Sequence, residues 1–477
     1  MITFGIQRKK KHPKHKITIE KGVEAMKHSE SMTEGNIVKS ILWFAFPIMI
    51  GNIFQQLYNV VDTAIIGNVL GKSAIAAVGA STPIYNLIIG FACGITNGFS
   101  VVLARFYGAK DEAQMKKTVT LTYLLTILIS LVLTVGILLT LTPFLKVLKT
   151  PDKIIGQTAQ YLKIIMACSL ITMLFNMFSG ILRAIGNSKM PLYFLIVASA
   201  VNIVLDIVFV KYCGMGFAGA AYATVIAQLV SVVLCILYIY RKCRLLVFDK
   251  AYLHWDGALI KELILMGLSM GLMLVVVSIG SVALQRGINS LGEDLIASHT
   301  AGRKIDDMFM LPLGTVSTAA STFASQNLGA GKIKRVQKGI QTSIKIALVW
   351  SLLSTIISLV FGKPMIAALT GTKEAFIINA GYRFIKWNIP FYFILSFLLV
   401  LRSSLQGLGR KIVPIMGSMI ELIMKFATVG IITNQLGYFG VCILEPIIWG
   451  MSAVLVIADY MRFIREHKEE REKAWNG

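Results

Sequence analysis

Residues 118–142 read TVTLTYLLTILISLVLTVGILLTLT, a run that contains no charged side chain. About 20 consecutive apolar residues in a helix cross the hydrocarbon core of a bilayer, because each residue advances the helix by about 1.5 Å. The uncharged apolar run is therefore long enough to predict one complete membrane crossing by a single helix.

The composition of the whole chain agrees with that run. Of its 477 residues, 56% are hydrophobic and only 15% are charged, whereas soluble domains have about 25% charged residues. The net charge of +23 lies in tails and in loops between apolar runs, which favours membrane topology over a nucleic-acid partner. The six cysteines include no CxxC pair, so neither a zinc site nor a redox motif is indicated.

Twelve apolar runs are predicted to be membrane-spanning helices. They cover residues 40–61, 75–102, 118–142, 159–182, 192–212, 217–240, 261–285, 295–322, 340–362, 384–402, 413–435 and 438–462. Helices are the expected spanning elements because they satisfy their own backbone hydrogen bonds in lipid. The runs are about twice as long as the strands of a membrane barrel. The predicted fold class is an all-α membrane protein.

Basic residues between the runs fall mainly on one side of the predicted membrane. That side holds both tails and pairs such as Arg241-Lys242 and Arg410-Lys411. Because cytoplasmic loops carry an excess of Lys and Arg, both termini are predicted to be cytoplasmic in a multi-pass protein of the cell membrane. Both termini on one side require an even number of spans.

The two halves of the chain resemble each other. Gly108-Ala109 recurs as Gly329-Ala330, a shift of 221 positions (329 minus 108), and Gly216 recurs as Gly437 at the same shift. With six spans each, both halves enter the membrane from the same side, as in a parallel repeat. Two six-helix lobes around a central cavity, rocking by alternating access, are therefore expected.

The predicted division of the chain follows this repeat. It consists of a basic cytoplasmic tail at 1–36, an N-lobe at 37–245, a cytoplasmic linker at 246–257, a C-lobe at 258–465 and a tail at 466–477. We expect a monomer surrounded by membrane lipid.

Polar residues inside the first span share one helix face. Gln55, Asn59 and Asp62 are spaced i, i+4, i+7, and Gln56 lies beside them, so that face would line a wet interior. Asp62 could instead lie at the membrane interface. Pro47 removes an intrahelical hydrogen bond and is predicted to kink this span.

The fifth span carries Asn202 and Asp206 at i, i+4. A carboxylate and an amide supply oxygen ligands for a small cation, and a buried Asp can also carry a proton. A hydrogen bond that holds the bundle together is the structural alternative.

The second half contains more charges within its spans. Four of them form a cluster: Arg303, Lys304, Asp306 and Asp307. This cluster could bind substrate, act as a gate or be a structural network. Glu421 and Lys425, at i, i+4, are predicted to form a structural ion pair. Glu445, beside a proline, could be functional or structural.

The chain shows no nucleotide-binding loop of the GxxxxGK[ST] type and no nucleophile–base constellation. An enzyme is therefore not expected. Any energy for transport would come from an ion gradient.

Several motifs resemble those of the MATE (multidrug and toxic compound extrusion) family over about residues 36–462. They are FQQLYNVVDTAIIG (54–67), LGKSAIAAVGASTP (70–83), GFSVVLARFYGAKD (98–111), LRAIGNSKMP (182–191), GFAGAAYATVIAQ (216–228), STFASQNLGAGK (321–332) and SSLQGLGRKIVP (403–414). The resemblance implies a twelve-helix, two-lobed antiporter. Such proteins export small organic, often cationic, compounds in exchange for Na⁺ or H⁺, without a cofactor.

The resemblance also implies a cation site in the N-lobe. One branch of the family binds its cation, Na⁺ if sodium-coupled, at positions that match Asp62, Asn202, Asp206 and Thr224, beside a hinge that matches Pro47. A second branch uses acids in spans 7 and 10, and this chain has no acid between Met266 and Gly287 or between Phe384 and Leu401. A lipid-linked saccharide flippase of the same superfamily is the alternative function, and a channel or receptor is a third class.

Overall fold

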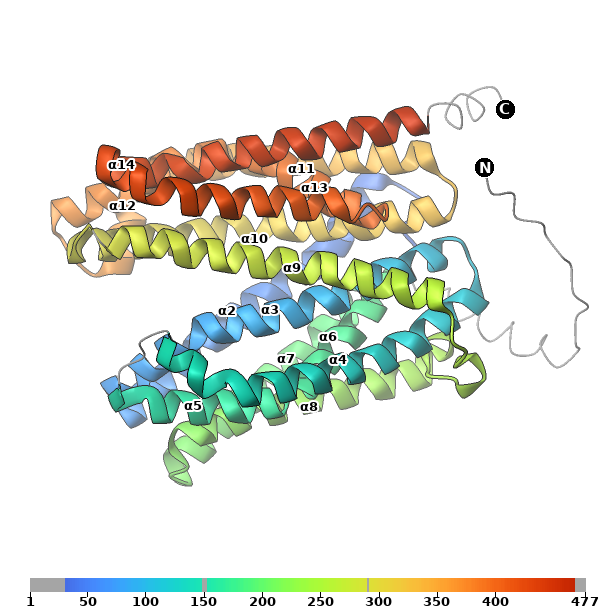
Figure 1. Ribbon diagram of the computed structural model, residues 1–477, viewed down its shortest axis with the longest axis horizontal. Coiled ribbons are helices and arrows are strands. Elements are labelled where there is room, and N and C mark those ends of the chain that lie inside the picture. Colours follow the sequence, from blue (N-terminus) through green and yellow to red (C-terminus); the bar gives the residue numbers. More distant parts are fainter. Residues whose placement is uncertain (1–30, 148–151, 290, 468–477) are drawn as a thin grey trace, which may run out of the picture.

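The computed structural model of the protein describes residues 31–147, 152–289 and 291–467. Within these residues the secondary structure is helical, without strands. The long helices lie side by side along one axis, and both described ends of the chain lie at the same end of the bundle (Figure 1). We call this end the basic end, because Arg335 donates to the Gly35 carbonyl, Arg410 pairs with Glu466, and Arg105 lies beside Gly409. Most of the predicted tails at 1–36 and 466–477, namely residues 1–30 and 468–477, lies outside the described residues.

The first half forms one lobe. It comprises α2 (Ile37–Leu70), α3 (Lys72–Gly108), α4 (Glu112–Val147), α5 (Asp152–Ala167), α6 (Ser169–Ala184), α7 (Lys189–Asp206), the π-helix η1 (Ile207–Tyr212) and α8 (Gly216–Lys242). The helices α5 and α6 form one span with a bend of 53°. The short 3-10 turns η2 (Arg244–Leu246) and η3 (Lys250–Tyr252) lead to the second half.

The second half forms the other lobe. It comprises α9 (Gly257–Asn289), α10 (Glu293–Gly329), α11 (Ile333–Thr370), α12 (Ala375–Asn388), the 3-10 turn η4 (Ile389–Phe391), α13 (Tyr392–Gly407) and α14 (Ile412–Glu466). The chain reverses within α14 at Gly437, whose φ of 55° and ψ of −141° are not helical. Glycine adopts this backbone conformation because it has no Cβ. The helix α14 therefore supplies two spans.

The predicted fold class is confirmed: the protein is an all-α, two-lobed membrane protein with twelve spans. In the described part of the chain, nine segments are long and apolar enough to cross a membrane, with α12 to α13 counted as one segment, and the bent α5–α6 pair makes ten. The more polar α10 and the first part of α14 are the remaining two of the twelve spans. Most helices are longer than the predicted runs, because their polar ends extend beyond the lipid core. One result is that Asp62 lies well inside α2 and not at the end of a span.

Glycines bring the two lobes together along α3 and α9. A Cβ on Gly94 would lie 2.5 Å from the Cα of Gly271, and one on Gly98 would lie 2.6 Å from the Cα of Gly267. Each helix therefore presents a GxxxG motif to the other, the pattern that allows membrane helices to approach closely. This contact is the GxxxG seam between the lobes.

A second contact joins the lobes at the basic end. The Met32 N–H donates to Gln326 Oε1 at 3.0 Å, and Asn327 Nδ2 donates to the Met32 carbonyl at 3.2 Å. Arg335 donates to the carbonyls of Glu34 and Gly35, at 2.6 and 2.8 Å. The chain that precedes α2 is thereby fastened to α10 and α11.

Ion pairs add to this closure. Arg105 on α3 pairs with Glu262 on α9 at 2.5 Å, and Lys117 on α4 pairs with Asp256 at 2.6 Å. The side-chain hydrogen bond from Lys117 lowers the pKa of Asp256. The lobes are therefore held together at the basic end by hydrogen bonds and charges.

Candidate functional site

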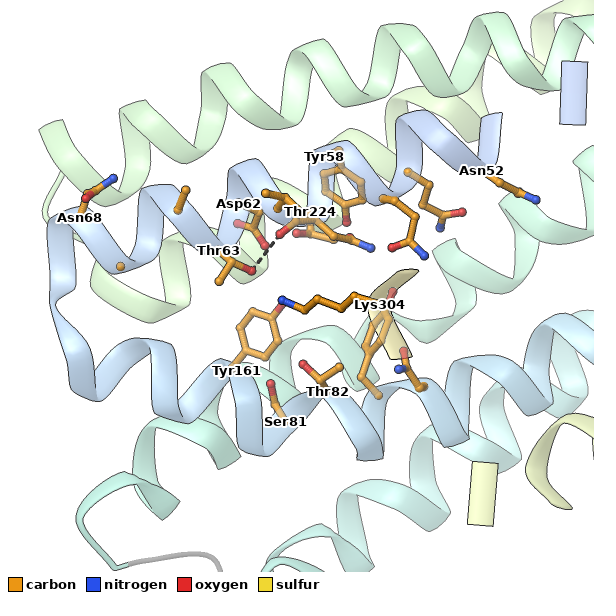
Figure 2. Close-up of a pocket in the computed structure, with 18 of the residues that line it drawn as sticks. Asn52, Tyr58, Asp62, Thr63, Asn68, Ser81, Thr82, Tyr161, Thr224 and Lys304 are labelled. Carbon is orange, nitrogen blue, oxygen red and sulfur yellow. Dashed lines mark hydrogen bonds between the residues drawn. The ribbon is translucent and has the colours of Figure 1, made fainter. Parts of the chain in front are cut away.

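A cavity of about 910 Å³ lies between α2, α3 and α10, with contributions from α5 and α8. Nearly all of its lining comes from the N-lobe, and the C-lobe contributes only Lys304 and Leu311. Figure 2 shows polar side chains that project into this space from α2 on one side and from α3 on the other. The cavity is therefore a feature of the N-lobe that α10 of the C-lobe borders.

The helix α2 provides one wall of the cavity. Gln55, Gln56, Asn59 and Asp62 all line it. Their spacing places them on one side of the helix, which turns by about 100° per residue. The first polar face identified in the sequence is thus directed into the cavity.

Two buried carboxyl groups meet behind this wall. Asp62 is 8% exposed and Asp206 is fully buried, and their carboxyl groups lie within hydrogen-bonding reach of each other. Among the described residues, neither oxygen of Asp206 has a hydrogen-bond partner, and neither has the buried Oδ1 of Asp62. Buried polar atoms are usually hydrogen-bonded, so these oxygens are available for a cation or a proton.

The local fold of α7 positions Asp206. Asp206 is the last residue of α7, and the chain continues as the π-helix Ile207–Tyr212. Short π-helical segments are frequent at functional sites, where they interrupt the regular hydrogen-bond ladder. Asn202 lies one turn earlier and is 1% exposed, and both polar atoms of its side chain lack a described partner. These two residues bring four unpartnered polar atoms to the same segment.

Thr224 on α8 completes the set implied by the family resemblance. It is buried and lines the cavity, and its hydroxyl donates to the Ala220 carbonyl at 3.1 Å. The structure therefore brings Asp62 and Asp206 together and places Thr224 on the same cavity wall as Asp62. Pro47 is buried within α2, which continues through it as one helix.

Three tyrosines of the site are absent from the sequence-based prediction. Tyr58, Tyr85 and Tyr161 line the cavity, and the Tyr58 hydroxyl hydrogen-bonds with Thr224. The position of Tyr58, four residues before Asp62, could have indicated the shared face. No spacing rule links Tyr85 on α3 or Tyr161 on α5 to that face, because their proximity is tertiary.

The chemistry of the buried set suits a small hard cation or a proton. Carboxylate, amide and hydroxyl oxygens are the ligands that such cations prefer. The described residues contain no group of three or more His, Cys, Asp or Glu side chains that could hold a metal ion. The buried set contains no His or Cys side chain, and these are the ligands that zinc and copper commonly take in proteins.

Charged residues of the C-lobe form a different arrangement. Glu445 is 2% exposed, and it accepts from Arg303 at 2.6 Å and from Lys425 at 3.2 Å. Arg303 also lies 3.6 Å from Asp306 and 3.5 Å from Asp307. The result is an ion-pair network between α10 and both parts of α14.

The fully buried Asp306 is anchored further by Tyr392. The Tyr392 hydroxyl donates to Asp306 Oδ1 at 2.7 Å. Some polar atoms near this contact have no described hydrogen-bond partner: both side-chain polar atoms of Asn388, Asp306 Oδ2 and Ser396 Oγ.

Two predictions about these charges need correction. Glu421 and Lys425 do not pair with each other: Glu421 accepts from Arg402 at 3.1 Å, and Lys425 pairs with Glu445. Partners on neighbouring helices replace the predicted pair within one helix. The predicted cluster also divides, since Lys304 points into the N-lobe cavity. Adjacent residues on a helix differ by about 100° in direction, which separates Lys304 from Arg303.

The chain is similar to known proteins over most of its length. The profile of the MatE family matches residues 47–208 and 262–429. The probable multidrug resistance protein YpnP of Bacillus subtilis is 28% identical over 412 residues, which cover 86% of this chain and 91% of YpnP. The probable multidrug resistance protein NorM of Thermotoga maritima is 24% identical, with 81% of this chain and 83% of NorM covered.

A solved structure shares the fold. It is described as the outward-facing conformation of a multidrug resistance MATE family transporter of the MOP superfamily. It superposes with a TM-score of 0.84 at 23% identity, over 94% of this chain and 99% of that one. The family profile matches more than half of the residues, and the chain therefore belongs to the MatE family of multidrug efflux transporters.

Proposed function

We propose that this protein is a secondary active transporter that exchanges Na⁺ or H⁺ for small organic compounds by alternating access. The observation that carries the proposal is the pair of buried carboxyl groups, Asp62 and Asp206, with oxygens that lack described donors beside a large polar cavity. The relatives named as multidrug resistance proteins support the export of organic compounds.

The coupling cation would bind in the N-lobe at Asp62, Asn202, Asp206 and Thr224. Two carboxylates within hydrogen-bonding reach repel each other when both are ionised, and a bound cation or proton removes this repulsion. The residues on α2 and α7 could then approach more closely. Because Pro47 interrupts the hydrogen-bond ladder of α2, we propose that α2 bends there and reduces the cavity.

Substrate export would follow from this change in α2. The same helix carries Gln55, Asn59 and Asp62 on the cavity wall, so its bending would displace a bound substrate. We expect an organic substrate with a cationic group, because Asp62 brings a negative charge to the cavity. No cofactor is required in this scheme, and we propose that a monomer suffices.

The alternating cycle needs a state in which the basic end opens. In the present structure this end is closed by the Met32–Gly35 segment and by the Arg105–Glu262 pair. We propose that these contacts break when the lobes rock, and that the basic end faces the cytoplasm. The excess of Lys and Arg at this end supports that orientation.

A lipid-linked saccharide flippase is the alternative. We expect such a protein to carry several cations in its central cavity in order to bind pyrophosphate. The cavity here has Lys304 and one carboxylate, Asp62, which favours ion-coupled efflux.

Transport into and out of proteoliposomes tests the proposal. Vesicles that contain the purified protein and a fluorescent organic cation would receive a Na⁺ gradient or a pH gradient, imposed separately. One gradient should drive export by the wild type, and Asp206→Asn should abolish the gradient-driven part. Asp307→Asn is the matched control, because Asp307 is 57% exposed on the C-lobe. Unchanged export by Asp206→Asn would exclude this coupling site.

A further inference from the structure

Most residues that line the N-lobe cavity carry a polar group in their side chain. Ligand pockets are usually lined mainly by hydrophobic and aromatic side chains, with few polar groups. Here the carboxamides are Asn52, Gln55, Gln56, Asn59, Asn68 and Asn86. Only Val60, Ala64, Gly67 and Leu311 contribute side chains without a polar group. A ligand must therefore supply many hydrogen-bond partners.

The cavity also contains one charge of each sign. Asp62 supplies the carboxylate, and Lys304 supplies the ammonium group. Figure 2 shows the Lys304 side chain extending between α2 and α3, toward the part of the cavity where Asp62, Thr63 and Tyr161 lie. Lys304 is exposed and makes no ion pair with any residue of the described chain. Its positive charge is available to a ligand.

Other ligand classes fit this cavity less well. A purely cationic, apolar compound would approach Lys304 with a like charge, and it would remove water from the amides that it covers without offering them new partners, which is unfavourable. A polyanion would meet only one lysine and would be repelled by Asp62. A neutral apolar compound would leave both charges and all the amides desolvated.

We infer that the substrates are polar zwitterionic organic compounds whose anionic group pairs with Lys304. The inference rests on the proposed efflux function and narrows its substrate class. The cationic group of such a compound lies toward Asp62, and its hydroxyl, carbonyl or amino groups bond to the amides of α2. Both charges of the ligand are then neutralised within the cavity.

The location of Lys304 gives this contact a second consequence. Lys304 lies on α10 of the C-lobe, whereas the amides and Asp62 belong to the N-lobe. A zwitterion bound in this way contacts both lobes at once. Separation of α10 from α2 removes the contact with the anionic group and weakens binding, so substrate release is linked to lobe movement.

Two dyes that differ by one charge test the inference. Rhodamine 110 carries a free carboxylate in addition to its cationic ring system, and rhodamine 123 is its methyl ester. Their affinities for the purified full-length protein in lipid nanodiscs would be measured by fluorescence anisotropy, without any ion gradient. We expect rhodamine 110 to bind about threefold to tenfold more tightly than rhodamine 123, as for one partly exposed ion pair.

Substitutions assign the preference to one residue. Lys304→Gln should weaken the binding of rhodamine 110 by the same factor and should leave the affinity for rhodamine 123 unchanged or higher. Lys304→Arg should keep the preference for rhodamine 110. Lys338→Gln is the matched control, because Lys338 is exposed on α11 and does not line the cavity.

Three outcomes would overturn the inference. The first is that the wild type binds the two dyes equally or prefers rhodamine 123. The second is that Lys304→Gln loses affinity for both dyes by the same factor. The third is that neither dye binds with a dissociation constant below about 1 mM. Because the measurement uses no gradient, its failure is distinguishable from a failure of coupling at Asp206. Conversely, a protein that binds rhodamine 110 through Lys304 without gradient-driven export would contradict the proposed function alone.

Discussion

The buried acids of the two lobes differ in what surrounds them. In the N-lobe, Asp62 and Asp206 face each other and retain oxygens without described donors. In the C-lobe, Glu445 forms ion pairs with both Arg303 and Lys425, and Glu421 forms an ion pair with Arg402. One repeated fold therefore holds two kinds of buried charge.

This difference indicates which lobe is available to a ligand. A buried charge with its partners in place contributes to the integrity of the bundle, and removal of one partner is strongly destabilising. A buried acid without partners is unfavourable by itself, so its presence favours a role that requires a ligand. This comparison supports our proposal that the cation binds in the N-lobe and that the charges of the C-lobe have a structural role.

The largest expected effect is in the C-lobe. Glu445→Gln removes the acid that Arg303 and the buried Lys425 share, leaving Lys425 without its ion-pair partner. We expect the free energy of unfolding to fall by about 3–5 kcal/mol. Thermal unfolding of the purified protein would measure it, with Asp307→Asn as a near-neutral control. A melting temperature equal to that of the wild type would show that this network does not stabilise the folded protein.

A smaller loss is expected where the lobes meet. Gly98→Ala places a Cβ against the backbone of Gly267 and should lower the free energy of unfolding by about 1–3 kcal/mol through overpacking. Gly136→Ala is the control, because a Cβ on Gly136 of α4 has no atom within 4 Å. Equal melting temperatures for the two variants would show that the GxxxG seam is not closely packed.

The acids of the N-lobe should show the opposite sign. Asp206→Asn removes the repulsion between two carboxylates, and the new amide can donate to Asp62. We expect the free energy of unfolding to rise by about 1 kcal/mol. Thermal unfolding without Na⁺, at a pH where acids are ionised, would detect this gain. A loss of stability as large as that of Glu445→Gln would show that Asp206 stabilises the fold as Glu445 does, and it would contradict the proposed difference between the lobes.

The smallest effect concerns pH and the link between the lobes. The pKa of Asp256 is lowered in the folded protein by the hydrogen bond from Lys117. Its stabilising contribution is therefore present above the unfolded pKa of about 3.9 and is lost as the pH falls through the folded value. Asp256→Asn should lower stability at pH 7 by at most about 1 kcal/mol, and this difference should vanish in acid. A difference that persists at low pH would contradict the ion-pair explanation.

Much of the fold could be predicted from the sequence. Span length, charge bias and the repeated glycines indicate twelve helices in two lobes, because a bilayer restricts the length and polarity of each segment. The break between α12 and α13 and the π-helix after Asp206 were not predicted, since they depend on local backbone geometry within apolar runs.

The candidate site was only partly predictable. The spacings i, i+4 and i, i+7 identified Asn59, Asp62, Asn202 and Asp206, because residues on one helix face are related by sequence alone. The contribution of Lys304 to the N-lobe cavity depends on how α10 packs across the lobes. The same is true of Lys425, whose partner lies on the other part of α14 and not one turn away. Contacts between helices leave no periodic signal in one sequence.

Direct measurement of cation binding is the most decisive test of the difference between the lobes. Bound Na⁺ would be counted by equilibrium dialysis with radioactive sodium, and bound protons by titration, on the purified wild type, Asp206→Asn and Asp306→Asn. The account predicts that the wild type binds one coupling cation, that Asp206→Asn loses it, and that Asp306→Asn retains it. Full binding by Asp206→Asn, together with loss in Asp306→Asn, would place the site in the C-lobe and contradict the account.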